Sequence, residues 1–258
     1  MNTSEPRPSD ESQPPAWQVR PLARVTSTQA EARDLPAWSA VWADEQTAGR
    51  GQAERGFVSD PGGIYLTAVL PFDGDALRAR GFALAVGRAV WGVLQTAGLR
   101  QVRLRWPNDL MAGAVKVGGI LVEQGGPHTL LVGLGLNLLN EPWRLDPALH
   151  GVAGRLADCG VPMPERRALV SALLDAIRHA HGEFLHLRLA GLAPRLEPCW
   201  AGRRMVRLEP AAGVRLVTER GRFCGIDADG ALRLLTDGDD EVLIPAHHVG
   251  RLIETEAV

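Results

Sequence analysis

The chain has 258 residues, of which 45% are hydrophobic and 22% charged, and its formal net charge is −2. This length and composition are typical of a soluble globular protein with one large domain, or one domain and a small addition. A charge so close to zero argues against a general electrostatic attraction to nucleic acid or to anionic membranes. The three cysteines lack CxxC spacing, which argues against a zinc site or a disulfide framework and favours reduced thiols in the cytoplasm.

The N-terminal segment, residues 1–16, differs in composition from the rest of the chain. It contains four prolines together with Ser, Asp and Glu, and it lacks the apolar core of a signal peptide. We therefore expect a disordered tail. The uncharged run Gln124–Asn140 is too short to cross a membrane and contains Gly-Leu-Gly, so we expect a turn and a buried strand there.

Residues 17–198 mix strand and helix patterns without strict alternation, which predicts an α+β domain with a mixed sheet. Ile, Tyr, Thr and Val followed by proline predict a strand at Gly62–Pro71, and apolar residues at helical spacing predict a helix at Asp75–Gly98. The later elements expected are a strand, a Pro-Asn-Asp turn and a hairpin within Val102–Gln124, a buried strand at Thr129–Leu139 and a helix at Pro164–Leu187.

The last part of the chain, residues 199–258, has a different character. Short strand-like segments alternate with turn residues and no long helix is indicated, so we expect a small all-β barrel of about 50 residues. The domain boundary is predicted between Leu196 and Ala201.

The segment Thr47–Phe57 is a glycine-rich loop that carries two arginines, Arg50 and Arg55. Glycines let backbone N–H groups approach a ligand, and arginine suits the capture of a carboxylate or a phosphate. The spacing required for a P-loop is missing. Taken alone, the loop favours the alternative interpretation, which is a solvent-exposed turn.

Two further stretches place polar residues in mostly apolar surroundings. Asn108 and Asp109 follow a strand and a proline, a position that suits either a well-formed turn or contacts with ribose, a metal-bound phosphate or adenine. Lys116 lies in a strand that should be buried, and period-two alternation predicts that it shares a face with Gly118 and Ile120. An edge lysine that reaches solvent is the alternative to a lysine that faces a ligand.

Six short motifs occur in a fixed order along the chain. They are STQ at Ser27–Gln29, QTAGRG at Gln46–Gly51, PGGIYL at Pro61–Leu66, RWPND at Arg105–Asp109, KVGGILVE at Lys116–Glu123 and VGLGLN at Val132–Asn137. In their order, spacing and residue identities they resemble biotin protein ligase, the enzyme also called biotin–[acetyl-CoA-carboxylase] ligase. The resemblance extends from Val25 to Ile253. The resemblance implies a mixed-sheet catalytic domain of the biotin/lipoate ligase type at 17–198 and an SH3-like β-barrel at 199–258.

Members of that family activate biotin with MgATP to biotinyl-5′-AMP and transfer biotin to one lysine of a biotin carboxyl carrier protein. The resemblance thus implies ATP and biotin as substrates, Mg²⁺ accompanying ATP, and no metal held by the protein itself. The catalytic residues implied are Lys116 and Arg50. Lys116 would contact both the biotin carboxylate and the α-phosphate, and Arg50 would belong to a loop that closes over the ligand. The biotin-binding residues implied are Ser27, Thr28, Gln29, Gln46, Arg50, Gly51, Gln52, Lys116 and Gly118. The nucleotide-binding residues implied are Trp106, Asn108, Asp109 and Asn137.

Three positions depart from the family pattern. Gln29 stands where Asn is usual and Arg105 stands where Lys is usual, and both changes keep the chemical character of the side chain. After Gly-Arg-Gly the family continues with more basic residues, whereas this chain has Gln52-Ala53-Glu54. We expect this less basic loop to hold biotinyl-5′-AMP less tightly.

The expected partners are biotin, ATP and the carrier protein, without DNA or a membrane, and the sequence leaves a homodimer open. No winged helix-turn-helix is indicated, so we expect the monofunctional type of ligase. Two alternatives compete with this interpretation: a lipoate or octanoyl transferase-like enzyme, which shares the fold, and a non-catalytic protein that binds biotin or a nucleotide. The Gly-Arg-Gly loop and the C-terminal barrel favour a biotin ligase over the first alternative.

Overall fold

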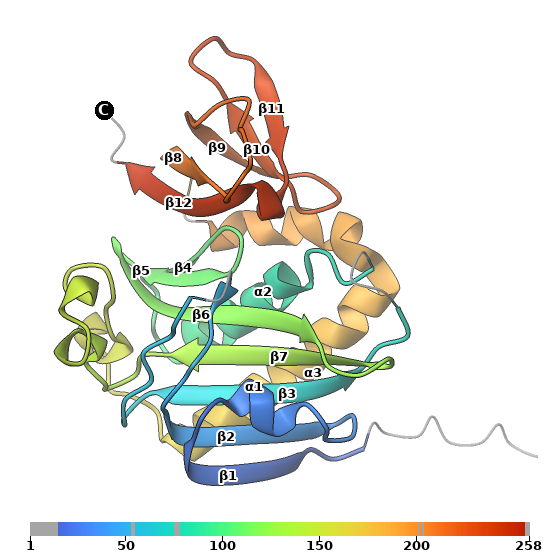
Figure 1. The fold of residues 1–258 in the computed structure, drawn as a ribbon, viewed down its shortest axis with the longest axis vertical. Helices are drawn as coiled ribbons and strands as arrows, with labels where there is room; N and C mark the ends of the chain where they lie inside the picture. The colour runs from blue at the N-terminus through green and yellow to red at the C-terminus, as the bar shows by residue number, and fades with distance from the viewer. Residues whose placement is uncertain (1–14, 53–54, 75–77, 201, 203, 256–258) are drawn as a thin grey trace, which may run out of the picture.

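The structure is a computed structural model and describes residues 15–52, 55–74, 78–200, 202 and 204–255. The tail expected at residues 1–16 therefore lies almost entirely outside the described residues. The described chain contains two β-sheets, and the smaller, C-terminal sheet lies beyond one edge of the larger sheet (Figure 1).

The larger sheet has seven strands in the order β1-β2-β3-β7-β6-β5-β4. β1 and β2 pair in parallel and the other neighbours are antiparallel, so the sheet is mixed, as predicted. Its strands are β1 Gln18–Val25, β2 Ser39–Gln46, β3 Ile64–Pro71, β4 Val102–Arg105, β5 Asp109–Ala112, β6 Val115–Gln124 and β7 Thr129–Leu136. The sequence did not indicate β1, because this edge strand is mostly exposed and contains Pro21, which masks the usual strand pattern.

Two long helices, α2 (Phe82–Thr96) and α3 (Arg166–Leu192), cover one face of the larger sheet (Figure 1). The short helix α1 (Thr28–Ala32) lies on the opposite face. The main core fills the space between the sheet and the two long helices, where Leu104 and Ile120 pack against Gly87 of α2. The face that carries α1 is thereby left free for a ligand site.

Helix α2 starts later than predicted. It begins at Phe82, and Gly81 before it has φ of 76°, a left-handed conformation that a right-handed helix cannot include. The first three residues of the predicted helix, 75–77, lie outside the described residues. Its C-terminus is as predicted, because Gly98 follows the last turn with φ of 86°.

Helix α3 continues past its predicted end at Leu187. Arg188 has φ of 55° and ψ of 178°, so the helix breaks there before it resumes. A 3-10 segment, η5 (Ala193–Cys199), then leads toward the C-terminal sheet. No helix within the described ranges is long and apolar enough to cross a membrane.

The C-terminal sheet consists of five antiparallel strands in the order β11-β10-β9-β8-β12. These strands are β8 Met205–Pro210, β9 Arg220–Ile226, β10 Leu232–Leu235, β11 Glu241–Ile244 and β12 Val249–Thr255. This arrangement confirms the small all-β unit predicted from the sequence and agrees with an SH3-like barrel. The remaining 3-10 segments are η2 Pro142–Arg144, η3 Pro147–Leu149, η4 Leu156–Cys159 and η6 Ala246–His248.

Candidate active site

A cavity of about 190 Å³ opens on the α1 face of the larger sheet, between α1, strands β6 and β7 and the loop at residues 47–57. It brings together most of the residues that the sequence predicts for the site, although these come from separate segments of the chain. The predicted residues that line it are Ser27, Thr28, Gln29, Gln46, Arg50, Gly51, Gln52, Asn108, Asp109 and Lys116. Lining residues to which the sequence assigned no role include Phe57, Gly119, Gly133 and Gly135.

Glycines keep the floor of this cavity open. A Cβ atom at Gly135 on β7 would lie 2.6 Å from the ring of Phe57, and one at Gly133 would lie 3.0 Å from Gln29 Nε2. Larger residues at these positions would therefore displace side chains that face the cavity. The Gly-Leu-Gly alternation was visible in the sequence, but without the strand register it indicated only a buried strand.

The prediction that Lys116 shares a face with Gly118 and Ile120 is wrong. A register shift between β5 and β6 marks a bulge next to Lys116, and a bulge changes which residues share a face. A Cβ atom at Gly119 would lie 3.1 Å from Lys116 Nζ, so Lys116 shares the cavity face with Gly119. Gly118 faces the core instead, where its Cβ position is 2.6 Å from Leu136 Cδ2, and it does not line the cavity.

One end of the cavity is lined by neutral polar groups that are already joined by hydrogen bonds. Gln46 Oε1 accepts bonds from the N–H and the Oγ1 of Thr28 at 2.8 and 3.0 Å, and Gln46 Nε2 donates to Ser59 Oγ at 2.9 Å. Thr67 Oγ1 donates to Thr28 Oγ1 at 2.9 Å. These bonds orient Thr28 and Gln46 independently of a ligand.

Two buried oxygen atoms at this neutral end have no hydrogen-bond partner within the described part of the chain. They are Ser27 Oγ and Gln29 Oε1, which belong to residues that are 3% and 4% exposed. The other end of the Gln29 amide is occupied, because its Nε2 donates to the carbonyl of Leu121 at 3.2 Å. Buried polar atoms in proteins nearly always have partners, so these two acceptors suit a ligand that carries N–H or O–H donors.

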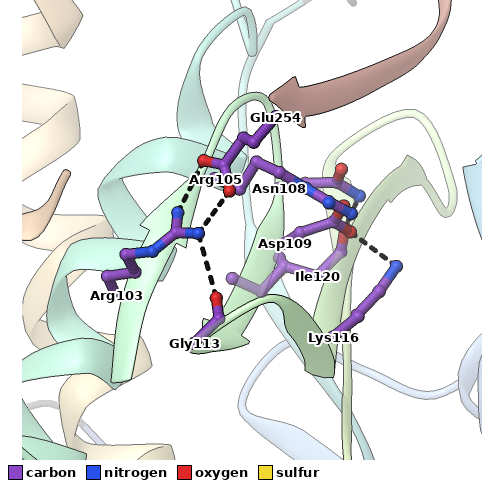
Figure 2. A network of polar contacts seen from close by, with 8 residues as sticks. All are labelled: Arg103, Arg105, Asn108, Asp109, Gly113, Lys116, Ile120 and Glu254. Atoms are coloured by element: carbon purple, nitrogen blue, oxygen red, sulfur yellow. Dashed lines mark hydrogen bonds and ion pairs between the residues drawn. The ribbon is translucent and has the colours of Figure 1, made fainter. Parts of the chain in front are cut away.

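The other end of the cavity is charged. Lys116 Nζ lies 2.5 Å from Asp109 Oδ1, and Arg105 Nη2 lies 2.7 Å from Asp109 Oδ2, so one carboxylate stands between two cations (Figure 2). Burial opposes ionisation of Asp109, but the charges and hydrogen bonds of Lys116 and Arg105 outweigh burial and hold the pKa of this carboxyl below its usual range. The cluster therefore keeps a net positive charge. Lys116 is also the only lysine in the sequence.

Strand β6 connects the two ends. Lys116 lies near its start, and Leu121, which accepts the bond from Gln29, lies five positions further along. The Lys116 side chain extends along the strand, because its Nζ lies 3.1 Å from the Cβ position of Gly119. The two positions from Gly119 to Leu121 correspond to roughly 7 Å along the strand. The cavity therefore suits an elongated molecule with hydrogen-bonding groups at one end and a negative charge at the other.

A second cavity, of about 510 Å³, continues from the charged end. It lies between the β4–β5 turn and the C-terminal sheet and shares Asn108, Asp109 and Lys116 with the first cavity. Trp106 and Arg251 also line it. The C-terminal sheet thus forms part of the wall next to Lys116.

All four predicted nucleotide-binding residues make contacts within the protein. Asn108 Nδ2 donates to the carbonyl of Ile120 at 2.6 Å, and Asp109 forms the ion pairs with Lys116 and Arg105 described above. Trp106 is 2% exposed, and its Nε1 donates to the carbonyl of Gly230 in the C-terminal sheet region at 2.9 Å. Asn137 lies outside both cavities; its Nδ2 donates to the carbonyl of Gly154 at 3.0 Å, and its Oδ1 accepts from Asn140 Nδ2 at 3.2 Å. Asn137 thus fastens the loop that runs beside β6.

The glycine-rich loop turns back on itself at the mouth of the first cavity. The N–H of Gly51 donates to the carbonyl of Arg55 at 2.7 Å, and Arg55 Nε donates to the carbonyl of Gln52 at 3.1 Å. Arg50 is exposed and its side chain is accessible to a ligand. Of the departure from the family pattern, Gln52 is described, whereas residues 53 and 54 lie outside the described residues.

Comparison with known proteins assigns this mixed sheet and its cavity to the class of biotin and lipoate ligases. The model of the Biotin/lipoate A/B protein ligase family matches residues 20–137. A biotin–[acetyl-CoA-carboxylase] ligase of Paracoccus denitrificans is 34% identical over 250 residues, which cover 88% of this chain and 98% of that protein. A ligase of the same name from Mycobacterium tuberculosis is 31% identical over 245 residues, which cover 85% of this chain and 88% of that protein.

A solved structure has the same fold. The biotin protein ligase from Aquifex aeolicus, in complex with biotin and ATP, aligns with a TM-score of 0.74 and 23% identity, covering 92% of this chain and 99% of that one. The solved structure shows the fold, and the family model and the sequence relatives show the family. The chain belongs to the biotin/lipoate A/B protein ligase family and is one of its biotin protein ligases.

Proposed function

We propose that the protein catalyses two successive reactions at this site. In the first, a carboxylate oxygen of biotin attacks the α-phosphorus of MgATP and pyrophosphate leaves, which gives biotinyl-5′-AMP. In the second, the ε-amino group of a lysine on a biotin carboxyl carrier protein attacks the biotinyl carbonyl carbon. An amide forms, AMP leaves and the amine loses a proton. The relatives from Paracoccus denitrificans and Mycobacterium tuberculosis are named as biotin–[acetyl-CoA-carboxylase] ligases, which supports this acceptor.

The observation that carries the proposal is that one cavity has neutral hydrogen-bond acceptors at one end and a net positive charge at the other. The ureido ring of biotin has two N–H donors. They match the acceptors Ser27 Oγ and Gln29 Oε1, which have no hydrogen-bond partner among the residues that the structure describes. Its carboxylate is at the far end of an acyl chain and would meet the ammonium group of Lys116. Gln46 and Thr28 would complete the ureido end, because their hydrogen bonds already fix their orientation.

We assign ATP to the second cavity, with Trp106, Asn108 and Asp109 along its wall. Both reactants of the first step are anions, so fixed cations are needed to offset their repulsion and to stabilise charge on the phosphorus oxygens. Lys116 lies where the two cavities meet and can contact both the biotin carboxylate and the α-phosphate. Mg²⁺ enters with ATP as part of the substrate.

The glycine-rich loop with Arg50 lies at the mouth of the biotin cavity, and we assign to it the exclusion of water from the acyl phosphate intermediate. Residues 17–198 would then form the catalytic domain, and residues 199–258 a barrel domain that closes one side of the nucleotide cavity.

Mass spectrometry of a carrier domain incubated with biotin, MgATP and this protein tests the proposal. We expect one biotinyl group on one lysine, formed only when biotin and ATP are both present. A product formed with lipoate and not with biotin would identify the lipoate ligase alternative. An unmodified carrier together with measurable binding of biotin would identify the non-catalytic alternative.

A further inference from the structure

A buried ion pair joins the C-terminal sheet to the part of the larger sheet that carries Lys116. Glu254 on β12 accepts a hydrogen bond from Arg103 Nη1 on β4 at 2.6 Å, and its second oxygen pairs with Arg103 Nη2 (Figure 2). The side chains of Arg103 and Glu254 are only 5% and 16% exposed. A two-pronged contact of this kind fixes the relative orientation of both groups.

The same guanidinium also holds the tip of the hairpin formed by β5 and β6. Arg103 Nη2 donates to the carbonyl of Gly113, the first of the two residues between these strands, at 3.1 Å. β5 begins with Asp109, and Lys116 is the second residue of β6, so the ion pair between them spans the hairpin that Arg103 fastens. Glu254 therefore reaches the charged end of the cavity through one intermediate side chain.

The hairpin lies next to the edge strand β4, which carries Arg103. β4 is the last strand of the seven, so it pairs with β5 on one side and with no strand of this sheet on the other. The bulge between β5 and β6 also lies within this hairpin and interrupts its regular pairing. The C-terminal sheet replaces the missing neighbour through the pair of Arg103 and Glu254.

We propose that Glu254 is a positioning residue for adenylate formation, which acts through Arg103 to hold the hairpin that places Lys116 against Asp109. This inference rests on the proposed function, because it concerns the placement of the group that meets the biotin carboxylate. Glu254 itself does not touch the substrates. The ureido end of the cavity takes its hydrogen bonds from α1, β2 and β3 and from Leu121 on β6, and none of these bonds involves the hairpin tip.

A second contact between the C-terminal sheet and the larger sheet allows a positioning role of Glu254 to be distinguished from a role in attaching the C-terminal sheet. Trp106 Nε1 donates to the carbonyl of Gly230, and this bond does not involve Glu254 or Arg103. Neutralising Glu254 therefore loosens the hairpin while the C-terminal sheet keeps another attachment. The chain also offers a matched control, because Arg233 and Glu241 form a two-pronged pair at 3.0 and 2.8 Å within the same sheet. Their side chains are 41% and 45% exposed.

The test compares Glu254→Gln with Glu241→Gln in the full chain, using biotin-dependent exchange between ATP and labelled pyrophosphate. For Glu254→Gln we expect kcat to fall by about ten- to a hundredfold, because a misplacement of about 1 Å costs on the order of a hundredfold. The Kd for biotin should change by less than about twofold, and Glu241→Gln should match the wild type in both quantities. Glu254→Asp keeps the charge, so it should recover part of kcat.

The double variant Arg103→Gln/Glu254→Gln shows whether Glu254 acts through Arg103. We expect its kcat to be no lower than that of the less active single variant, because both substitutions break the same chain of contacts. Thermal unfolding of each variant gives the folded fraction to which kcat is normalised. A normalised kcat for Glu254→Gln equal to that of Glu241→Gln would overturn the inference, and so would losses that multiply in the double variant. If the wild type shows no exchange, the proposed function is wrong. That result differs from a failure of the positioning role alone, in which the wild type and Glu254→Gln exchange equally well.

Discussion

The neutral and charged ends of the biotin cavity differ in how their polar groups are satisfied. At the neutral end, Thr28 and Gln46 are held by uncharged hydrogen bonds, while two buried oxygens have no partner within the described residues. At the charged end, Lys116 and Arg105 are both paired with Asp109. At the neutral end, a ligand can donate hydrogen bonds to the two oxygens. At the charged end, an anionic ligand competes with the Asp109 carboxylate for Lys116 and Arg105.

This difference separates recognition from reaction. Contacts with fixed neutral groups are similar in the ground state and the transition state, so they should govern KM and Kd. The charge on the phosphorus oxygens develops during the reaction, so the cations should govern kcat. Substitutions at the two ends should therefore change different kinetic constants.

Lys116→Ala is the change with the largest expected effect. We expect kcat for pyrophosphate exchange to fall by about 10²–10³-fold, the range for loss of one group that stabilises transition-state charge. The Kd for biotin, measured by calorimetry, should rise by much less. Lys116→Arg is the matched control and should be intermediate, because it keeps the charge and alters the donor geometry. Turnover close to normal in Lys116→Ala would remove this residue from the catalytic groups.

Asp109→Asn should give the next largest effect. It leaves Lys116 and Arg105 without the carboxylate that orients them, so we expect a loss in kcat of about tenfold or more. The free energy of unfolding should fall by roughly 2 kcal/mol, less than for a fully buried pair because the Lys116 side chain is 33% exposed. Exchange assays and chemical denaturation check both numbers. An increase in KM for biotin with unchanged kcat would break the proposed division between the ends.

The pH dependence of stability should report the same carboxylate. The pKa of Asp109 is lower in the folded protein than the ordinary value of about 3.9, so the ionised form stabilises the fold. Its contribution should be complete above about pH 5 and should be lost as the pH falls below about 4 toward the lowered folded-state pKa. Denaturation of the wild type and Asp109→Asn at a series of pH values should therefore give a difference that shrinks in acid. A constant difference across this range would contradict the assignment.

Ser27→Ala tests the neutral end. We expect KM for biotin to rise about five- to tenfold with little change in kcat, because one hydrogen bond to the ligand is lost. The stability of the ligand-free protein should stay the same or increase, since the hydroxyl removed is buried and has no partner within the described chain. Thr28→Val is the contrasting control, because it breaks existing bonds to Gln46 and Thr67 and should lower stability by about 1 kcal/mol. Loss of stability in Ser27→Ala would show that its hydroxyl serves the fold.

Gln52→Arg should have the smallest effect and concerns the glycine-rich loop that we propose to exclude water from the cavity. One added cation should retain biotinyl-5′-AMP better and lower the labelling of a bystander protein about two- to threefold, equivalent to roughly 0.5 kcal/mol for one exposed charge. The labelling must be measured on an added lysine-rich protein, because this chain contains a single lysine. Equal labelling by the wild type and Gln52→Arg would count against a leaky loop.

The sequence predicted most of the fold because its strong signals were local. The strand at β3 is a run of buried apolar residues, and glycine and proline mark the ends of several other elements. The motifs also located the residues of the cavity, since Ser27, Gln46 and Lys116 do line it. Features that depend on pairing between strands could not be read in this way. The bulge that turns Lys116 toward Gly119 is set by β5, and β1 has too few buried residues to stand out.

Contacts between the two sheets could not be predicted from the sequence for the same reason. Glu254 is near the end of the chain and its partner Arg103 lies 151 positions earlier, so no local pattern joins them. Asn137 belongs to a motif that the resemblance assigns to the nucleotide, whereas its side chain bonds to Gly154 and Asn140. A motif indicates that a residue matters, but its bonding partners come from the fold.

Biotin-dependent exchange between ATP and labelled pyrophosphate, measured on the wild type at saturating biotin, tests the central claim most directly. The cavity with free acceptors at one end and Lys116 at the other predicts rapid exchange that requires biotin and MgATP and needs no carrier protein. Exchange driven by lipoate and not by biotin, or no exchange in a folded protein that binds biotin, would contradict the account.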